Sequence, residues 1–268
     1  MNWGKLILIM GKGGVGKTVY SKSLARELVA SGKRILLCEL PQVFQEKQTV
    51  VEIEKNLFHM KLNSWDCFKE YIGLKLPIKA LQAILLSNNI IRYLERAAPG
   101  VREIVLIGKI WYELKQLDSS SHPLYDHIIV DMPSTGYALT ILNTPFHFAS
   151  LFPGGPIYSD SKEMIATFSD KQKTSLVVVS LAEEMPAQES IDFKEKLREL
   201  FPLNPPVLVL NRLLSDGSKL KLNLESPVLK RSYDHLQNRF NNQQPLIELL
   251  KKEFSRSVEI KEGSHGFF

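Results

Sequence analysis

Cysteine is scarce in this sequence, which contains only Cys38 and Cys67. The two lie far apart and form no CxxC pair, so cysteines alone cannot build a structural zinc site, and no disulfide framework is indicated. Cys38 falls in an apolar run over residues 35–38, and we therefore interpret it as a small buried hydrophobic residue.

Long hydrophobic runs are also missing, because none reaches the roughly 18 residues that a membrane-spanning helix needs. The first apolar run, residues 5–10, leads directly into a glycine-rich loop. We expect a buried strand there rather than a signal peptide, and hence a cytoplasmic protein without a transmembrane segment. The net charge of +5 comes from scattered basic residues, so no nucleic-acid partner is expected.

The most informative motif is GKGGVGKT at residues 11–18, which fits the pattern G-x-x-x-x-G-K-[ST]. The apolar run precedes it and a helical pattern over about 17–31 follows, which is the strand–loop–helix setting that a phosphate-binding loop requires. Glycines let backbone N–H groups close around phosphate oxygens, and the helix N-terminus adds positive potential. The motif therefore predicts a nucleotide site.

Individual residues of this loop have distinct predicted roles. Lys17 can reach terminal phosphates, and the Thr18 hydroxyl can ligate Mg²⁺. Lys12, directly after the first glycine, is typical of the deviant subclass of phosphate loops, in which this lysine crosses a dimer interface; a solvated surface lysine is the alternative. The candidate nucleotide-binding residues are Gly11, Lys12, Gly13, Gly14, Val15, Gly16, Lys17, Thr18 and Val19.

The order of apolar segments predicts an α/β fold with a doubly wound, mostly parallel sheet of the P-loop NTPase type. We expect one domain over residues 1–268, with a small helical insertion at about 64–118. That insertion is either an ordinary helical layer on the sheet or a partly exposed apolar face for a client or partner. Strands are expected at 5–10, 34–40, 125–131, 174–180, 206–211 and 257–260, and helices at about 17–31, 187–200 and much of 216–255.

Polar residues follow two of these predicted strands, at the edge where ligands bind in such sheets. Asp131 ends the strand over 127–130 and suits a second Mg²⁺-binding group that acts through water. Residues 132–136 suit a loop that responds to the γ-phosphate. The amide of Asn211 matches the N6 and N7 groups of adenine, while a helix cap or turn residue is the alternative.

The motifs together resemble the arsenite-pump and tail-anchored-protein-targeting ATPase family, especially its shorter bacterial members. The resemblance covers most of residues 4–213. It rests on GKGGVGKT, YDHIIVDMPSTGYALTILNTP (125–145), VVVSLAEEMPAQES (177–190), VLVLNRL (207–213) and AAPGVREIVLIGKIWYEL (97–114).

The resemblance implies an ATP- and Mg²⁺-dependent dimer with both nucleotides at the subunit interface. By position, Lys12 is the cross-subunit lysine, Lys17 and Thr18 hold phosphate and Mg²⁺, and Asp131 is the metal-linked carboxylate. Residues 131–136 form the second switch, and Asn211 reads adenine. Glu183 and Glu184 match a family loop near the site, although acids that open a helix also complement its dipole.

One position departs from the family. The family's attacking water is oriented by an aspartate just after the second strand, where ungapped counting from Lys17 places Pro41. Proline cannot accept a proton, and water positioning is central to phosphoryl transfer to water. Glu39 is the nearest carboxylate, on the same strand face, and joins Lys12 and Lys17 as a candidate catalytic residue.

We therefore expect an ATP-binding, nucleotide-switched homo- or heterodimer that hydrolyses ATP slowly or not at all by itself. A non-hydrolysing ATP-bound scaffold, or the partner of an active paralogue, is one alternative. A MinD/ParA-like positioning ATPase is another, although the amphipathic stretch 245–254 is better interpreted as a core-packed helix. A small-molecule kinase lacks an acceptor-site motif.

The family's client functions transfer poorly to this sequence. Its arsenite sites and zinc-bridged dimer use cysteines that are missing here, and its targeting members use a methionine-rich helical insertion, whereas this chain has six methionines. The apolar helices at 64–118 retain the capacity to hold an apolar helical client or partner.

Overall fold

The computed structural model describes residues 2–40, 47–76, 78–88, 93, 97–214 and 227–261. Within them, eight strands form one sheet in the order β3-β4-β2-β5-β1-β6-β7-β8. The strands are β1 (Leu6–Met10), β2 (Ile35–Glu39), β3 (Thr49–Glu54), β4 (Leu57–Lys61), β5 (His127–Asp131), β6 (Thr174–Leu181), β7 (Val207–Leu213) and β8 (Ser257–Lys261).

The pairing of the strands is parallel except between β3 and β4, which form an antiparallel hairpin at one edge. The central strands are buried on both faces, as their continuous apolar runs require. The predicted doubly wound, mostly parallel α/β fold is confirmed. The hairpin was not predicted, because β3 is exposed along its whole length and its sequence carries no buried apolar face.

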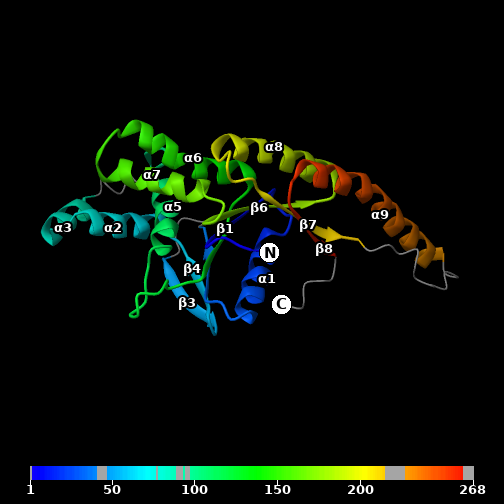
Figure 1. Cartoon of the computed structure of the whole chain (residues 1–268), viewed down its shortest axis with the longest axis horizontal. Helices are drawn as coiled ribbons and strands as arrows, with labels where there is room; N and C mark the ends of the chain where they lie inside the picture. The colour runs from blue at the N-terminus through cyan, green and yellow to red at the C-terminus, as the bar shows by residue number, and fades with distance from the viewer. Residues whose placement is uncertain are drawn as a thin grey trace.

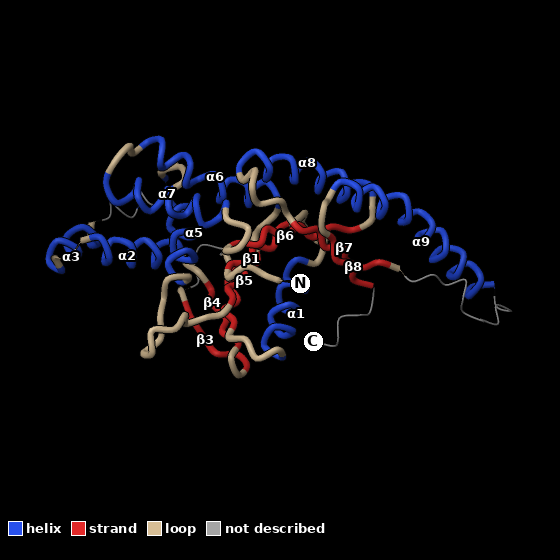
Figure 2. Tube along the Cα trace, viewed as in Figure 1, coloured by secondary structure: helices blue, strands red, loops and turns tan. Residues whose placement is uncertain are grey.

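Helices cover both faces of the sheet, with α1 on one face and α5 to α9 on the other (Figures 1 and 2). In Figure 1, α2 and α3 extend beyond one end of the sheet and α9 beyond the other. The helices are α1 (Lys17–Ala30), α2 (Ser64–Lys75), α3 (Lys79–Ser87), α5 (Val101–Glu113), α6 (Thr135–Leu151), α7 (Gly155–Ser169), α8 (Glu184–Leu200) and α9 (Pro227–Glu253).

The core consists of two apolar clusters separated by the sheet. Because side chains alternate along a strand, Leu6 and Leu8 of β1 belong to the larger cluster under α5 to α9. Ile7 and Ile9 belong to the smaller cluster under α1. Both faces of β1 are therefore buried in apolar clusters, and this packing holds the strand that leads into the phosphate loop.

The predicted helical region at 64–118 contains α2, α3 and α5. Asn63 caps α2 by accepting a hydrogen bond from the Asp66 N–H at 3.0 Å. Helix α5 packs Ile107 and Ile110 into the main core, whereas Ile78 before α3 is 61% exposed. The region thus contains both a packed layer and an exposed apolar part, and its standing as a separate subdomain remains a prediction.

At the C-terminal side, α9 lies within the predicted helical stretch 216–255, of which residues 216–226 fall outside the described residues. Ile247, Leu250 and Phe254 are buried in the main core, in agreement with a core-packed final helix. No helix in the described ranges combines the length and apolar character needed to cross a membrane.

Candidate nucleotide-binding site

Residues 11–16 connect β1 to α1, so the predicted phosphate loop lies between a buried strand and a helix N-terminus, and Lys17, Thr18 and Val19 begin α1. Gly14 and Gly16 both adopt positive φ, at 83° and 94°. Such left-handed residues turn successive N–H groups toward one concave side, which is a geometry that binds anions. A Cβ atom added at Gly13 or Gly14 would meet nothing within 4 Å, so the loop leaves open space above it.

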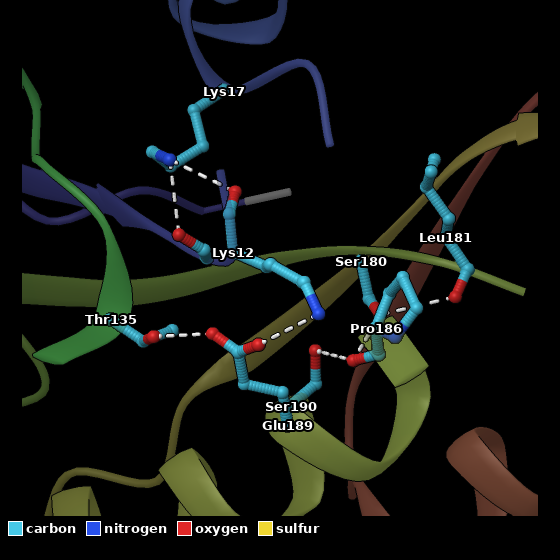
Figure 3. A network of polar contacts seen from close by, with 9 residues as sticks. Lys12, Lys17, Thr135, Ser180, Leu181, Pro186, Glu189 and Ser190 are labelled. Carbon is cyan, nitrogen blue, oxygen red and sulfur yellow. Dashed lines mark hydrogen bonds and ion pairs between the residues drawn. The ribbon is translucent and has the colours of Figure 1, made fainter. Parts of the chain in front are cut away.

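Lys17 lies folded over this loop, as Figure 3 shows. Its ammonium group donates hydrogen bonds to the carbonyl oxygens of Gly11 and Lys12, both at 3.0 Å. Burial lowers the pKa of Lys17 below its ordinary value of 10.5, while the charges of Asp131 and Glu189 raise it in part. The ammonium group of Lys17 therefore lies beside the loop, where phosphate oxygens of a nucleotide would take the place of the two carbonyl oxygens as its hydrogen-bond acceptors.

Asp131 ends β5, which pairs with β1 so that Asp131 stands beside Ile9 at the carboxyl edge of the sheet. The Thr18 hydroxyl donates a hydrogen bond to Asp131 Oδ2 at 2.6 Å. Oδ1 of the same carboxylate is buried and has no hydrogen-bond partner among the described residues. Burial raises the pKa of Asp131, as does the nearby charge of Glu39.

This pair of side chains fits a nucleotide-bound Mg²⁺. The described residues contain no cluster of three or more metal-ligating His, Cys, Asp or Glu side chains. Mg²⁺ in nucleotide sites takes one or two protein ligands and completes its shell with water and phosphate oxygens. Asp131 Oδ1, a buried oxygen without a hydrogen-bond partner in the described part of the chain, lies next to the Thr18 hydroxyl and matches that requirement.

Glu39 lies opposite Asp131 in the register of β2 and β5, and both line a cavity of about 450 Å³ above the phosphate loop. Its Oε2 is 3.1 Å from Nε2 of His59, a residue that the sequence analysis did not single out. His59 belongs to β4, whose parallel pairing with β2 places it there, and β4 was not predicted. Pro41 lies outside the described residues.

Lys12 is held within its own chain by α8 (Figure 3). Its ammonium group is 3.2 Å from Glu189 Oε2, and the Thr135 hydroxyl donates to Glu189 Oε1 at 2.5 Å. One carboxylate thus links the phosphate loop to the segment 131–136. Sequence reasoning selected Glu183 and Glu184, which stand at the N-cap and in the first turn of α8.

The signal that points to Glu189 is electrostatic. Lys12 is predicted to meet a nucleotide on a second subunit, so in the isolated subunit its positive charge lacks that partner. A carboxylate within reach stabilises the charge. The sequence shows Glu189 about one helical turn beyond the two acids that open α8, but only the packing of α8 beside the loop brings it to Lys12.

Asn211 lies in β7, is 2% exposed and does not line the cavity above the loop. Its Nδ2 donates to the Val15 carbonyl oxygen at 2.9 Å, and its Oδ1 accepts from the Arg212 N–H at 2.9 Å. The amide therefore braces the phosphate loop from below. Recognition of adenine by Asn211 remains a prediction.

The fold and this loop define a P-loop nucleotide-binding protein. The chain belongs to the anion-transporting ATPase family, whose model matches residues 4–153. The resemblance predicted from the motifs is confirmed.

Three relatives illustrate the range of similar proteins. ATPase BagA of Mycobacterium tuberculosis is 28% identical over 73% of this chain and 62% of its own length. ATPase ASNA1 homolog 1 of Paramecium tetraurelia is 25% identical over 95% of this chain and 89% of its own length. The arsenical pump-driving ATPase of Escherichia coli is 26% identical over 87% of this chain and 43% of its own length. The chain thus spans about three fifths of the mycobacterial protein.

Proposed function

We propose that this protein binds Mg²⁺ and ATP above the phosphate loop and works as a nucleotide-switched dimer that hydrolyses ATP slowly or not at all by itself. The observation that carries the proposal is the hydrogen bond between Thr18 and Asp131 beside the loop that Lys17 covers. These groups supply an anion-binding loop, a mobile cation and a metal-linked carboxylate in one cavity.

In the bound state, Lys17 exchanges the carbonyl oxygens of Gly11 and Lys12 for phosphate oxygens. Thr18 and Asp131 would hold Mg²⁺, whose charge would neutralise the phosphates. The N–H groups of the loop and the first turn of α1 point toward the same oxygens. Desolvation of Asp131, which opposes its charge in the free protein, then favours cation binding.

The switch in this proposal is the network of Lys12, Glu189 and Thr135. The side chains of Lys12 and Glu189 are 31% and 34% exposed, so their ion pair is worth at most about 1 kcal/mol. A nucleotide on a second subunit can therefore draw Lys12 away from Glu189. Release of Glu189 also removes the acceptor of Thr135, and the change reaches the segment 131–136.

Slow hydrolysis follows from the sequence at position 41. Proline there cannot orient water, and the nearest carboxylate, Glu39, lies against His59. A non-hydrolysing scaffold, or the partner of a catalytically complete paralogue, is the second candidate function, and Pro41 is the observation that favours it.

The test measures ATP binding and ATP turnover on the same samples of wild type, Lys17→Ala and Glu39→Gln. Binding without turnover in wild type supports the disabled switch. Turnover at the family's usual rate that survives in Glu39→Gln refutes both slow hydrolysis and the substitute role of Glu39. Absence of ATP binding in wild type refutes the proposed function altogether.

The partner remains a proposal as well. The exposed side chains of Ile78 and Tyr93, at 61% and 69%, support an apolar helical client or partner on residues 64–118. Recovery of an apolar helical segment only in the presence of ATP would support it. The cytoplasmic location stays a prediction.

A further inference from the structure

A second cavity lies away from the phosphate loop, among α2, α5, α6 and α7. Its volume is about 510 Å³, which falls in the range of small-molecule sites, and it shares no lining residue with the cavity above the loop. In Figure 1 these four helices gather at one end of the molecule. Its apolar walls include Phe68, Ile104, Val105, Trp111, Phe148 and Met164.

Ser161 of α7 is the informative polar group in this cavity. Its side chain is fully buried, at 0% exposure, and its hydroxyl has no hydrogen-bond partner among the described residues. A buried hydroxyl without a partner is unfavourable, and helical serines usually bond a carbonyl one turn back. A ligand with a hydrogen-bonding group would satisfy Ser161.

The charged side chains on the cavity wall already have partners of opposite charge. The pairs are Lys75 with Asp160 at 2.7 Å, Lys109 with Glu70 at 2.6 Å and with Glu113 at 2.7 Å, and Lys115 with Glu163 at 2.6 Å. An ionic head group would have to break one of these pairs and leave a charge without its partner. The wall therefore favours a neutral ligand.

The depth of the cavity indicates a slender occupant. Ser161 and Met164 are 0% and 3% exposed, so the floor lies in the protein core, whereas Leu74 and Phe152 at the mouth are 53% and 44% exposed. An α-helix with side chains is about 10–12 Å across and would lie over the mouth. A single-chain molecule is slender enough to bring a polar group at its end to the floor, with its hydrocarbon chain along the walls.

We propose that this cavity binds a neutral single-chain amphiphile, of the fatty alcohol or monoglyceride class, whose hydroxyl or carbonyl group bonds Ser161. The apolar walls bury the chain, and the paired charges at the wall stay intact. The cavity shares no lining residue with the nucleotide site, so failure of nucleotide binding leaves this proposal standing.

Binding is measured by calorimetry with decanol below its solubility limit, and with decanoate and decyltrimethylammonium below their micelle concentrations. Trp111 lines the cavity, so its fluorescence in a Trp3→Phe/Trp65→Phe background gives a local second readout. We expect decanol to bind and the two charged probes to bind at least about tenfold more weakly. Ser161→Ala should weaken decanol by about three- to tenfold, the effect of one lost hydrogen bond.

A blocking variant tests the location. Gly108 of α5 lines the cavity, and a Cβ added there meets nothing within 4 Å, so the position accepts a side chain and Gly108→Leu should occupy part of the cavity. Gly73 of α2 is equally open but does not line the cavity, so Gly73→Leu is the matched control. Both changes remove a helical glycine and should preserve folding, which thermal unfolding checks.

Gly108→Leu should abolish decanol binding while Gly73→Leu retains it. The proposal is overturned if decanol does not bind to wild type, if the charged probes bind as tightly, or if folded Gly108→Leu keeps its affinity. Binding of an apolar helical peptide in place of decanol also overturns it, because the site would then be a helix groove.

Discussion

Gly16→Ala is the sharpest test of how the phosphate loop is held. Gly16 has a φ of 94°, and a Cβ atom added there would lie 2.3 Å from Nδ2 of Asn211. That nitrogen is the donor to the Val15 carbonyl oxygen. The substitution therefore strains the backbone and also displaces the side chain that braces the loop.

The expected magnitude has two parts. A left-handed alanine costs about 1–2 kcal/mol relative to glycine. Displacement of the Asn211 amide breaks a hydrogen bond and leaves the Val15 carbonyl oxygen unsatisfied, which adds about 2 kcal/mol. Gly14 provides a matched control, because its φ is 83° and its added Cβ meets nothing within 4 Å. Gly14→Ala should carry only the first cost.

The assay is thermal unfolding without nucleotide. A difference of about 2 kcal/mol corresponds to a Tm about 4–8 °C lower for Gly16→Ala than for Gly14→Ala. In an Asn211→Ala background the obstructing nitrogen is gone, so the added cost of Gly16→Ala should fall to that of Gly14→Ala. This double-mutant cycle isolates the contact between Gly16 and Asn211.

Two results would refute the reasoning: equal Tm values for the two alanine variants, or an added cost that persists without Asn211. The same series separates two roles of Asn211. A brace lowers Tm in the absence of nucleotide when it is removed. An adenine reader, by contrast, changes the preference for ATP over GTP and leaves the Tm of the free protein unchanged.

Three further predictions concern charge. Burial raises the pKa of Asp131 in the folded protein above its ordinary 3.8. The contribution of Asp131 to folding stability is therefore fully present below pH 3.8 and is lost as the pH rises through the raised pKa of the folded protein. Asp131→Asn should therefore raise the Tm of the metal-free protein at neutral pH, and this increase in Tm should disappear in acid. The substitution should also abolish the further stabilisation by Mg²⁺ and ATP. A lower Tm at neutral pH would contradict this reasoning. Glu189→Gln frees Lys12 from a partly exposed pair, so it should change Tm little and raise the ATP-dependent dimer fraction in sedimentation, unlike Asp192→Asn on the same helix. A smaller dimer fraction would contradict the switch. Burial lowers the pKa of Lys17 below 10.5, so ATP affinity should fall before that pH is reached, whereas Lys17→Arg should hold its affinity constant over the same range; parallel pH profiles would show that Lys17 does not titrate.

The sequence by itself determined the phosphate loop, the strand before it and the helix after it. Glycine spacing and an apolar run are local properties, and they specify the left-handed loop wherever it occurs. The position of Asp131 at the ligand edge also followed from the sequence, because the carboxyl ends of parallel strands share one edge. Continuous apolar strands alternating with helices gave the doubly wound fold.

Only the tertiary structure decided which side chains meet. Glu189 reaches Lys12 and Thr135 because α8 packs beside the loop. His59 reaches Glu39 because β4 pairs in parallel with β2. Asn211 donates a hydrogen bond to the Val15 carbonyl oxygen, a contact across most of the chain. Contacts between residues distant in sequence depend on how whole helices and strands pack, and no local sequence pattern predicts them. The same packing leaves the Ser161 hydroxyl in the second cavity without a hydrogen-bond partner among the residues that the structure describes.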